Sequence, residues 1–172
     1  MLNAVCNSGP LIHLAQINLL KTFKIFQELI IPRSVFGEVT ISGKPGEVEI
    51  RSLKNLKTVD ISKDELREIA KLKRRLKGWR LSQPELEAIY LSRRTNRMFL
   101  TDDLDAREAA ESIGIEVHGS VGIIVRAFKE RMLTLEETVR GLNDLYEKSR
   151  LFVSKTIIDE AIRAVRKHKS GV

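Results

Sequence analysis

Short apolar runs alternate with longer segments of helical periodicity along most of the chain. The apolar runs at residues 2–6, 29–31, 98–101 and 115–118 have the length and composition of buried strands. Between them, apolar residues recur every three or four positions, as on one face of a helix. Strands separated by helices predict βαβ units, so we expect an α/β fold with a mainly parallel central sheet and helices on both of its faces.

Capping residues indicate where several of the helices begin. Ser62 and Ser82 are each followed three residues later by Glu, which is the pattern of a capping box. Helices are expected from Pro10, from Pro32, over 62–77, over 82–95, over 103–113, from Ser120, from Thr134 and over 155–167. Residues 47–60 are left unassigned. No linker divides the chain, so we expect a domain over 1–130 with a helical extension over 131–172 packed on it.

The composition is that of a folded globular protein. Apolar residues make up 42% and charged residues 31% of the 172 positions, which argues against a mainly disordered chain. A single cysteine excludes an intrachain disulfide and suits a reducing cytosol. No apolar run approaches a membrane span, so we expect a cytoplasmic protein with no membrane partner. The formal net charge of +7 favours a polyanionic partner without identifying one.

Oxygen-bearing side chains follow the predicted strands at the edge where ligands of parallel sheets usually bind. Asn7 follows the first strand, Asp102 and Asp103 follow the strand at 98–101, and Glu38 and Glu85 lie in helices near strand ends. Carboxylates held close together repel one another, and a hard divalent cation removes that conflict. Mg²⁺ and Mn²⁺ prefer oxygen ligands and can activate a water for phosphodiester hydrolysis. The pattern therefore predicts a metal-dependent site.

Each of these residues also has a purely structural interpretation. Glu85 is the reciprocal member of the capping box that Ser82 begins. Asp102 or Asp103 is well placed to cap the following helix. Asn7 would stabilise the turn after the first strand, and Glu38 would lie on the solvated face of a short helix. Only their joint placement favours a functional site.

A basic segment precedes the helix that contains Glu85. The cations and one aromatic residue of this segment are Lys71, Lys73, Arg74, Arg75, Lys77, Trp79 and Arg80. Cations supply affinity for phosphate without reading sequence, and Trp79 would stack on an unpaired base, so a single-stranded nucleic acid is a candidate partner. The alternative is a solvated helix face, with Leu72 and Leu76 inward and Trp79 packed in the core.

Four segments, in order, carry a resemblance to a known family. They are VCNSGPLIHLA from residue 5, IIPRSVFGEV from residue 30, LSQPELEAIYLS from residue 81, and MFLTDDLDAREAAESIGIEVHGSVGII from residue 98. Each resembles the corresponding segment of PIN-like (PilT N-terminus) domains, in a prokaryotic branch with an Asn-containing start before Pro-Leu-Ile. The TDDLDAR segment is the most specific of the four.

The resemblance implies a three-layer α/β/α domain with an acidic pocket that binds Mg²⁺ or Mn²⁺ in ribonucleases, including toxins of toxin–antitoxin pairs. Carried over residue by residue, the catalytic and metal-binding pocket comprises Asn7, Glu38, Glu85, Asp102 and Asp103. RNA and an antitoxin protein are then the expected partners. A homodimer is a further expectation, with Ile123, Ile124, Ala127 and Phe128 as the apolar face that it would bury.

One departure keeps two functions open. Typical nuclease members have Asp where this chain has Asn7, and an amide retains one oxygen ligand but loses a full negative charge. The first hypothesis is a metal-dependent endoribonuclease that leaves a 5′-phosphate and a 3′-hydroxyl. The second is a catalytically weak or inactive PIN-like module that binds RNA or a protein.

Overall fold

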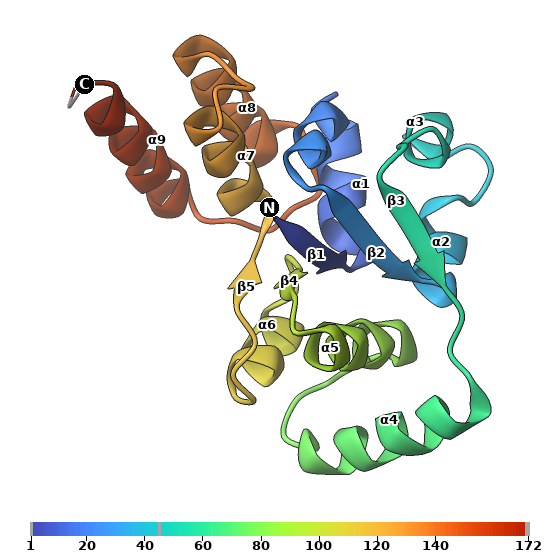
Figure 1. Cartoon of the computed structure of the whole chain (residues 1–172). Coiled ribbons are helices and arrows are strands. Elements are labelled where there is room, and N and C mark those ends of the chain that lie inside the picture. Colours follow the sequence, from blue (N-terminus) through green and yellow to red (C-terminus); the bar gives the residue numbers. More distant parts are fainter. Residues whose placement is uncertain (1, 45, 171–172) are drawn as a thin grey trace.

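Five parallel strands form one sheet at the centre of the molecule (Figure 1). The computed structural model describes residues 2–44 and 46–170. The strands are ordered β3-β2-β1-β4-β5 across the sheet. Their bounds are β1 Asn3–Cys6, β2 Glu28–Pro32, β3 Leu56–Val59, β4 Met98–Leu100 and β5 Val117–His118. Because β1 pairs with both β2 and β4, the first strand of the chain lies in the middle of the sheet.

Helices cover both faces of this sheet, as predicted. They are α1 Ser8–Gln16, the 3₁₀ helix η1 Leu20–Ile25, α2 Arg33–Val39, α3 Glu47–Arg51, α4 Lys63–Arg75, α5 Gln83–Thr95, α6 Leu104–Glu111, α7 Ser120–Lys129, α8 Leu135–Glu147 and α9 Lys155–Ser170. Figure 1 places α4, α5 and α6 on one side of the sheet and α1, α7 and α8 on the other. The three layers are those of the expected α/β/α fold.

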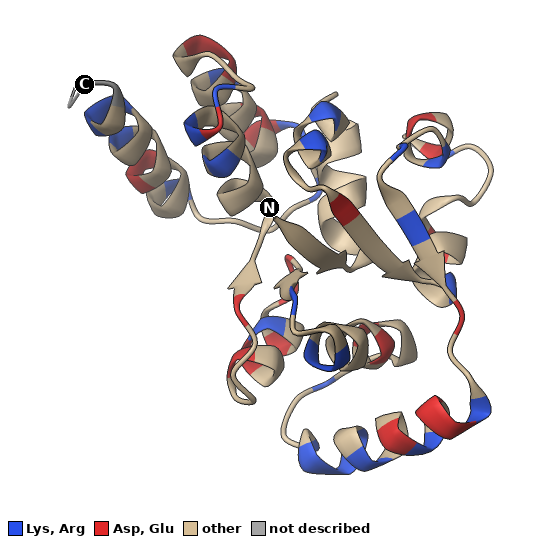
Figure 2. Ribbon diagram, in the orientation of Figure 1, with Lys and Arg blue, Asp and Glu red and all other residues tan. Residues whose placement is uncertain are grey.

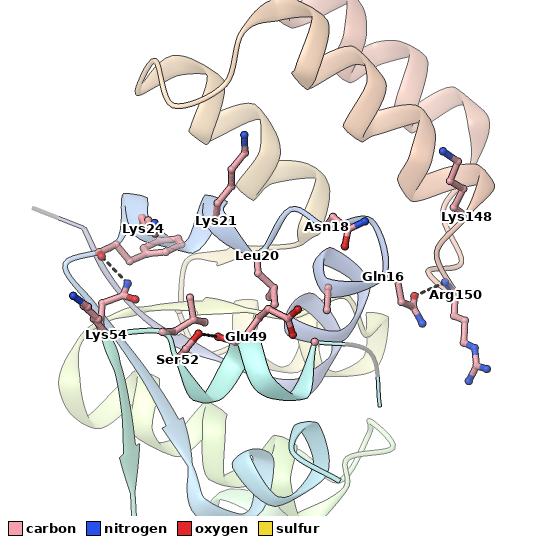
Figure 3. A pocket seen from close by; sticks show the side chains of 15 residues that line it. Gln16, Asn18, Leu20, Lys21, Lys24, Glu49, Ser52, Lys54, Lys148 and Arg150 are labelled. Atoms are coloured by element: carbon pink, nitrogen blue, oxygen red, sulfur yellow. Dashed lines mark hydrogen bonds between the residues drawn. The ribbon is translucent and has the colours of Figure 1, made fainter. Parts of the chain in front are cut away.

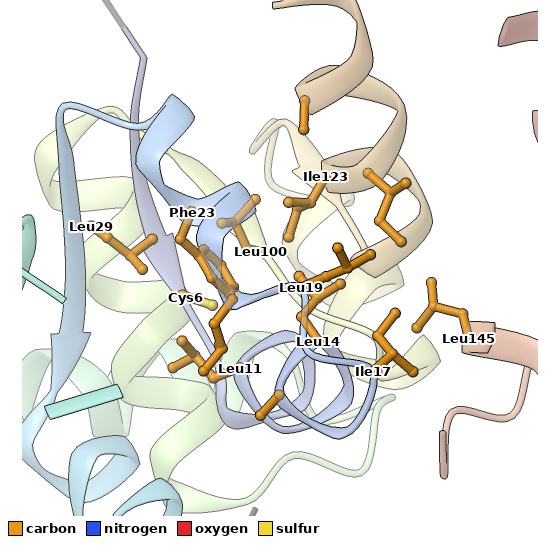
Figure 4. Close-up of a cluster of buried hydrophobic side chains, with 14 of the residues drawn as sticks. Cys6, Leu11, Leu14, Ile17, Leu19, Phe23, Leu29, Leu100, Ile123 and Leu145 are labelled. Atoms are coloured by element: carbon orange, nitrogen blue, oxygen red, sulfur yellow. The ribbon is translucent and has the colours of Figure 1, made fainter. Parts of the chain in front are cut away.

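Alternation along β1 divides the buried side chains into two clusters. Ala4 and Cys6 point into the larger cluster, and Val5 points into the smaller one, because successive side chains of a strand face opposite sides of a sheet. The larger cluster contains residues of α1, η1 and α7, several of which Figure 4 shows packed around Phe23. Leu142 of α8 and Ile158 of α9 also belong to it. The helical extension therefore packs on the same core as the sheet.

Most strands and helices lie where the hydrophobic pattern placed them, but three elements were not anticipated. They are η1, α3 and β3. The last two fall within the unassigned residues 47–60, where β3 is an edge strand that is only half-buried. Because neither face of β3 is deeply buried, apolar and polar residues alternate only weakly along it, and the sequence pattern did not predict the strand.

The apolar face expected to form a dimer interface is used inside the chain instead. Ile123, Ile124 and Ala127 of α7 are at most 1% exposed and belong to the larger core cluster. The ring of Phe128 lies 6.0 Å, edge-on, from that of His168 on α9. The prediction of a dimer surface is wrong for Ile123, Ile124 and Ala127, because this face of α7 packs against the sheet, η1 and α8 within the chain. Within residues 2–44 and 46–170, no helix is long and apolar enough to cross a membrane.

Candidate functional site

The ends of β1, β4 and β5 meet at one edge of the sheet, which we call the carboxyl edge. Cys6 of β1 is in register with Leu100 of β4, and the backbone N–H of Asn7 donates to the carbonyl of Leu100 at 2.9 Å. The two strands are therefore neighbours, as the prediction of a shared site required. Asn7 and Asp102, which follow them, project from the same edge.

Asp102 is held at this edge by three hydrogen bonds. Its Oδ1 accepts from the backbone N–H of Ser120 at 2.7 Å, and its Oδ2 accepts from the Ser120 hydroxyl at 2.6 Å. The same Oδ2 lies 2.7 Å from Nδ1 of His13 on α1. The Asp102 side chain is only 6% exposed. Donors from α1 and from the start of α7 thus fix the orientation of one nearly buried carboxylate.

Glycine lets the chain approach this carboxylate closely. A Cβ atom on Gly119 would lie 2.7 Å from Oδ1 of Asp102 and 3.2 Å from the carbonyl of Thr101. A Cβ atom on Gly9 would lie 3.4 Å from the Cβ of Asp102. Burial raises the pKa of the Cys6 thiol, and the negative charge of Asp102 raises that pKa further. The carboxylate therefore sits where β1, β4 and the start of α7 crowd together.

Three of the other predicted ligands cap helices. The side chain of Asn7 accepts from the N–H of Ser8 at 2.9 Å, and Asp103 accepts from the N–H of Ala106 at 2.8 Å. Oε2 of Glu85 accepts from both the N–H and the hydroxyl of Ser82. The capping box at Glu85 is confirmed. These oxygens already accept hydrogen bonds from local donors.

Glu38 and Glu87 are two further acidic residues, on α2 and α5. Glu38 is half-buried, and among the described residues no hydrogen bond or ion pair joins its side chain to Asp102. Glu87 on α5 is only 8% exposed and accepts from the Ser34 hydroxyl and, at 3.1 Å, from the side-chain amide of Gln83. Sequence reasoning singled out Glu85, yet Glu87 is the buried acid of α5.

His13 and Ser120 were also missed as members of the site. Ser120 comes two residues after β5, next to the strand that precedes Asp102, so its place at the carboxyl edge was readable from the sheet order. His13 lies five residues into α1, and its contact with Asp102 depends on the rotation of that helix. The sequence carries no signal for that rotation.

The predicted ligands suit Mg²⁺ or Mn²⁺ in chemistry but not in arrangement. All five offer oxygen atoms, which these ions prefer. However, the described part of the chain contains no group of three or more Asp, Glu, His or Cys side chains placed to hold a metal ion. Asn7, Glu85 and Asp103 are committed to helix caps, and both oxygens of Asp102 accept protein donors. As placed, the residues do not form a metal site.

The basic segment is exposed along one side of α4 and the turn after it. All six of its cations are exposed, whereas Leu72 and Leu76 lie inward in the smaller core cluster. Figure 2 shows acidic positions toward the start of α4 and basic positions toward its end. Trp79 packs on the smaller cluster, and its indole N–H donates to Glu108 at 3.2 Å. Lys71 forms an ion pair with Glu68 at 2.6 Å, and all six cations are exposed to solvent, where a polyanion can reach them, while the indole is already in contact with the protein.

Comparison with known proteins agrees with this fold. The chain is similar to a structure titled VapBC2 from Rickettsia felis bound to a DNA fragment from their promoter, with a TM-score of 0.52 and 13% identity over 69% of this chain and 98% of that one. None of the curated proteins matches the chain. The family model DUF3368, described as PIN domain, matches residues 3–167. The chain therefore belongs to this PIN domain family.

Proposed function

We propose that the protein is a ribonuclease that hydrolyses single-stranded RNA at the carboxyl edge, and that it is the toxin of a toxin–antitoxin pair. Membership of a PIN domain family supports a nuclease. The similarity to a VapBC2 structure supports an antitoxin as the partner protein. In this proposal the exposed cations from Lys71 to Arg80 bind the RNA phosphates and guide the strand to the site.

The observation that carries the proposal is the fixed carboxylate of Asp102. An ionised carboxylate only accepts hydrogen bonds, so Nδ1 of His13 is the donor in their 2.7 Å contact. A neutral imidazole that donates through Nδ1 has its Nε2 free to accept a proton. In many hydrolases a buried carboxylate orients an imidazole in this way, and the imidazole acts as the general base. Asp102 and His13 have the chemistry for this role.

The proposed reaction uses these two residues. Nε2 of His13 takes a proton from the attacking water as the water oxygen bonds to phosphorus. The bond from phosphorus to the 3′ oxygen breaks, and that oxygen takes up a proton from solvent. The products are a 5′-phosphate and a 3′-hydroxyl. Since the predicted ligands do not form a metal site as placed, no step is assigned to a metal ion.

Replacing one oxygen of the key carboxylate tests the proposal. We expect Asp102→Asn to lower the cleavage rate of a single-stranded oligouridylate in Mn²⁺-containing buffer by about 100-fold or more. Asp159→Asn on α9 is the matched control, because Asp159 is 49% exposed and contacts Lys155. Circular dichroism would confirm that both variants fold. The proposal is overturned if Asp102→Asn cleaves the RNA at the wild-type rate, or if the wild type does not cleave it at all.

A second candidate function is a PIN module that binds RNA or protein without cutting. Asn7 favours it, because the amide serves as the cap of α1 and brings no charge to the site. An RNA cleavage assay, beside RNA binding measured by fluorescence polarisation, separates the two. RNA binding without cleavage would support the second candidate. Cleavage by the wild type would exclude it.

A further inference from the structure

A broad basic groove of about 1070 Å³ lies away from the carboxyl edge. It is bordered by the end of α1, by η1, by α3 with the turn that leads into β3, and by the segment after α8. Its β-sheet side is formed by Phe26, which precedes β2, and by Asn55, which precedes β3. The groove therefore opens at the amino edge of the parallel sheet. Figure 3 shows its lining side chains.

Cations from these segments surround the groove. Lys21 and Lys148 line it but are engaged, with Glu137 at 2.9 Å and with Asp144 at 2.8 Å. Lys24, Lys54 and the guanidinium of Arg150 are exposed and have no ion-pair partner among the described residues. Among the described residues of the lining, Glu49 is the single carboxylate. The groove thus presents three cations without an ion-pair partner, and one carboxylate.

The frame that carries these cations is fixed by hydrogen bonds. The side chain of Gln16 accepts from the backbone N–H of Arg150 at 2.9 Å, which ties the segment after α8 to α1. The side-chain amide of Asn55 donates to the carbonyls of Phe23 and Phe26, each at 2.9 Å, which ties the turn carrying Lys54 to η1. The backbone segments that carry the cations are therefore held in place before any partner binds.

The groove lacks the features that single-stranded RNA needs. Proteins that bind unpaired bases stack them on exposed aromatic rings, and the aromatic residue of this lining, Phe26, is 4% exposed. The guanidinium of Arg150 can bind a carboxylate through two parallel hydrogen bonds, as it can a phosphate. The exposed amide of Asn18 can hydrogen-bond to a peptide backbone. Charge and chemistry together fit an acidic polypeptide better than a nucleic acid.

We infer that the amino-edge groove is a docking site for an acidic segment of a partner protein, held by Lys24, Lys54 and Arg150. This site is separate from the carboxyl edge, so the inference does not depend on whether the protein is a nuclease. A bound segment would leave Asp102 and the basic end of α4 unobstructed, because these lie on other parts of the molecule. The protein would then hold RNA and a protein partner on different surfaces.

Two charge-reversal variants of the full chain separate the surfaces. The groove variant combines Lys24→Glu with Lys54→Glu, and the matched control combines Lys73→Glu with Lys77→Glu at the end of α4. The probes are a fluorescein-labelled peptide of Glu, Leu and Ala of about twelve residues, the same peptide with Gln in place of Glu, and an oligouridylate of similar length. Binding is measured by fluorescence polarisation, and thermal unfolding checks that each variant is folded.

We expect the wild type to bind the Glu peptide more tightly than the Gln peptide. The groove variant should weaken Glu-peptide binding about tenfold, while the α4 variant changes it by less than about twofold. The α4 variant should be the one that weakens oligouridylate binding. The inference is overturned if the wild type does not bind the Glu peptide at millimolar concentration, or if both variants bind the peptide equally weakly. It is also overturned if the groove variant loses binding to the oligouridylate and keeps binding to the peptide.

Discussion

At the carboxyl edge of the sheet, the Asp102 side chain is 6% exposed and accepts three hydrogen bonds. At the amino edge, Lys24, Lys54 and Arg150 are exposed and have no ion-pair partner in the described part of the chain. A charge removed from water is tolerable only when its partners are built into the fold. A charge left in water needs no partner and can attract one from solution. The two edges therefore differ in purpose. The carboxyl edge holds one group in a fixed orientation, and the amino edge offers several groups to a ligand.

The largest stability effect should come from crowding the carboxyl edge. Gly119→Ala places a methyl group 2.7 Å from Oδ1 of Asp102 and 3.2 Å from the carbonyl of Thr101, so the hydrogen-bonded carboxylate or the backbone must shift. We expect a loss of about 1–3 kcal/mol in the free energy of unfolding, measured with urea. Gly37→Ala on α2 is the control, because nothing lies within 4 Å of its added Cβ and Ala favours a helix. Equal stability of Gly119→Ala and the wild type would show that the edge is loosely packed.

An effect of similar size should come from removing one donor to Asp102. Ser120→Ala deletes the 2.6 Å hydrogen bond to Oδ2 but keeps the backbone donor to Oδ1. Because this bond ends on a charged group, we expect a loss of about 1.5–3 kcal/mol. Ser112→Ala, which deletes a bond to the neutral carbonyl of Ala109, should cost about 0.5–1.5 kcal/mol. Urea denaturation of the two variants gives the comparison, and a greater loss in Ser112→Ala would contradict it.

The smallest effect concerns the rim of the amino-edge groove and depends on pH. The backbone N–H of Thr134 and then the ammonium of Lys21 lower the pKa of Glu137 from its ordinary value of 4.5 to about 2. A carboxyl whose pKa is lowered by folding stabilises the protein above the unfolded-state pKa and loses that contribution as pH falls through the folded-state pKa. Glu137→Gln should therefore lower the melting temperature at pH 7, with the difference shrinking between about pH 4.5 and pH 2.

Glu136→Gln is the control for that experiment. It removes a charge from the same first turn of α8 without removing the hydrogen bonds of Glu137. Its melting temperature should follow that of the wild type across the same pH range. If the difference between Glu137→Gln and the wild type were constant from pH 7 to pH 2, the ionised form of Glu137 would not be the source of the stabilisation.

Much of the fold was predictable because its signals are local. The capping boxes at Ser62, Ser82 and Thr134 mark three helix starts, and the structure contains all three. Buried strands such as β1 and β4 are short apolar runs with clear ends. The edge strand β3 lacks both features, because one side of it is open to solvent and its alternation is weak.

The site was predictable only as far as the sheet order. Asn7 and Asp102 were predicted because they follow predicted strands, and the structure places both positions at the same edge. The partners of Asp102 depend on how α1 and α7 pack, over separations of 89 residues for His13 and 18 for Ser120. Glu85 and Glu87 both lie on α5, but helix rotation makes the first a cap and buries the second. Packing between the helices and the sheet determines these contacts, and the periodicity of apolar residues in the sequence does not predict it.

The most direct test of the carboxyl-edge account is a double-mutant cycle on RNA cleavage. Single-turnover rates are compared for the wild type, His13→Gln, Asp102→Asn and the double variant. If Asp102 acts only by orienting His13, the double variant cuts no more slowly than His13→Gln alone, because Asp102 has no further effect once the imidazole is gone. Rate losses that multiply in the double variant would show that the residues act separately, and would contradict the account.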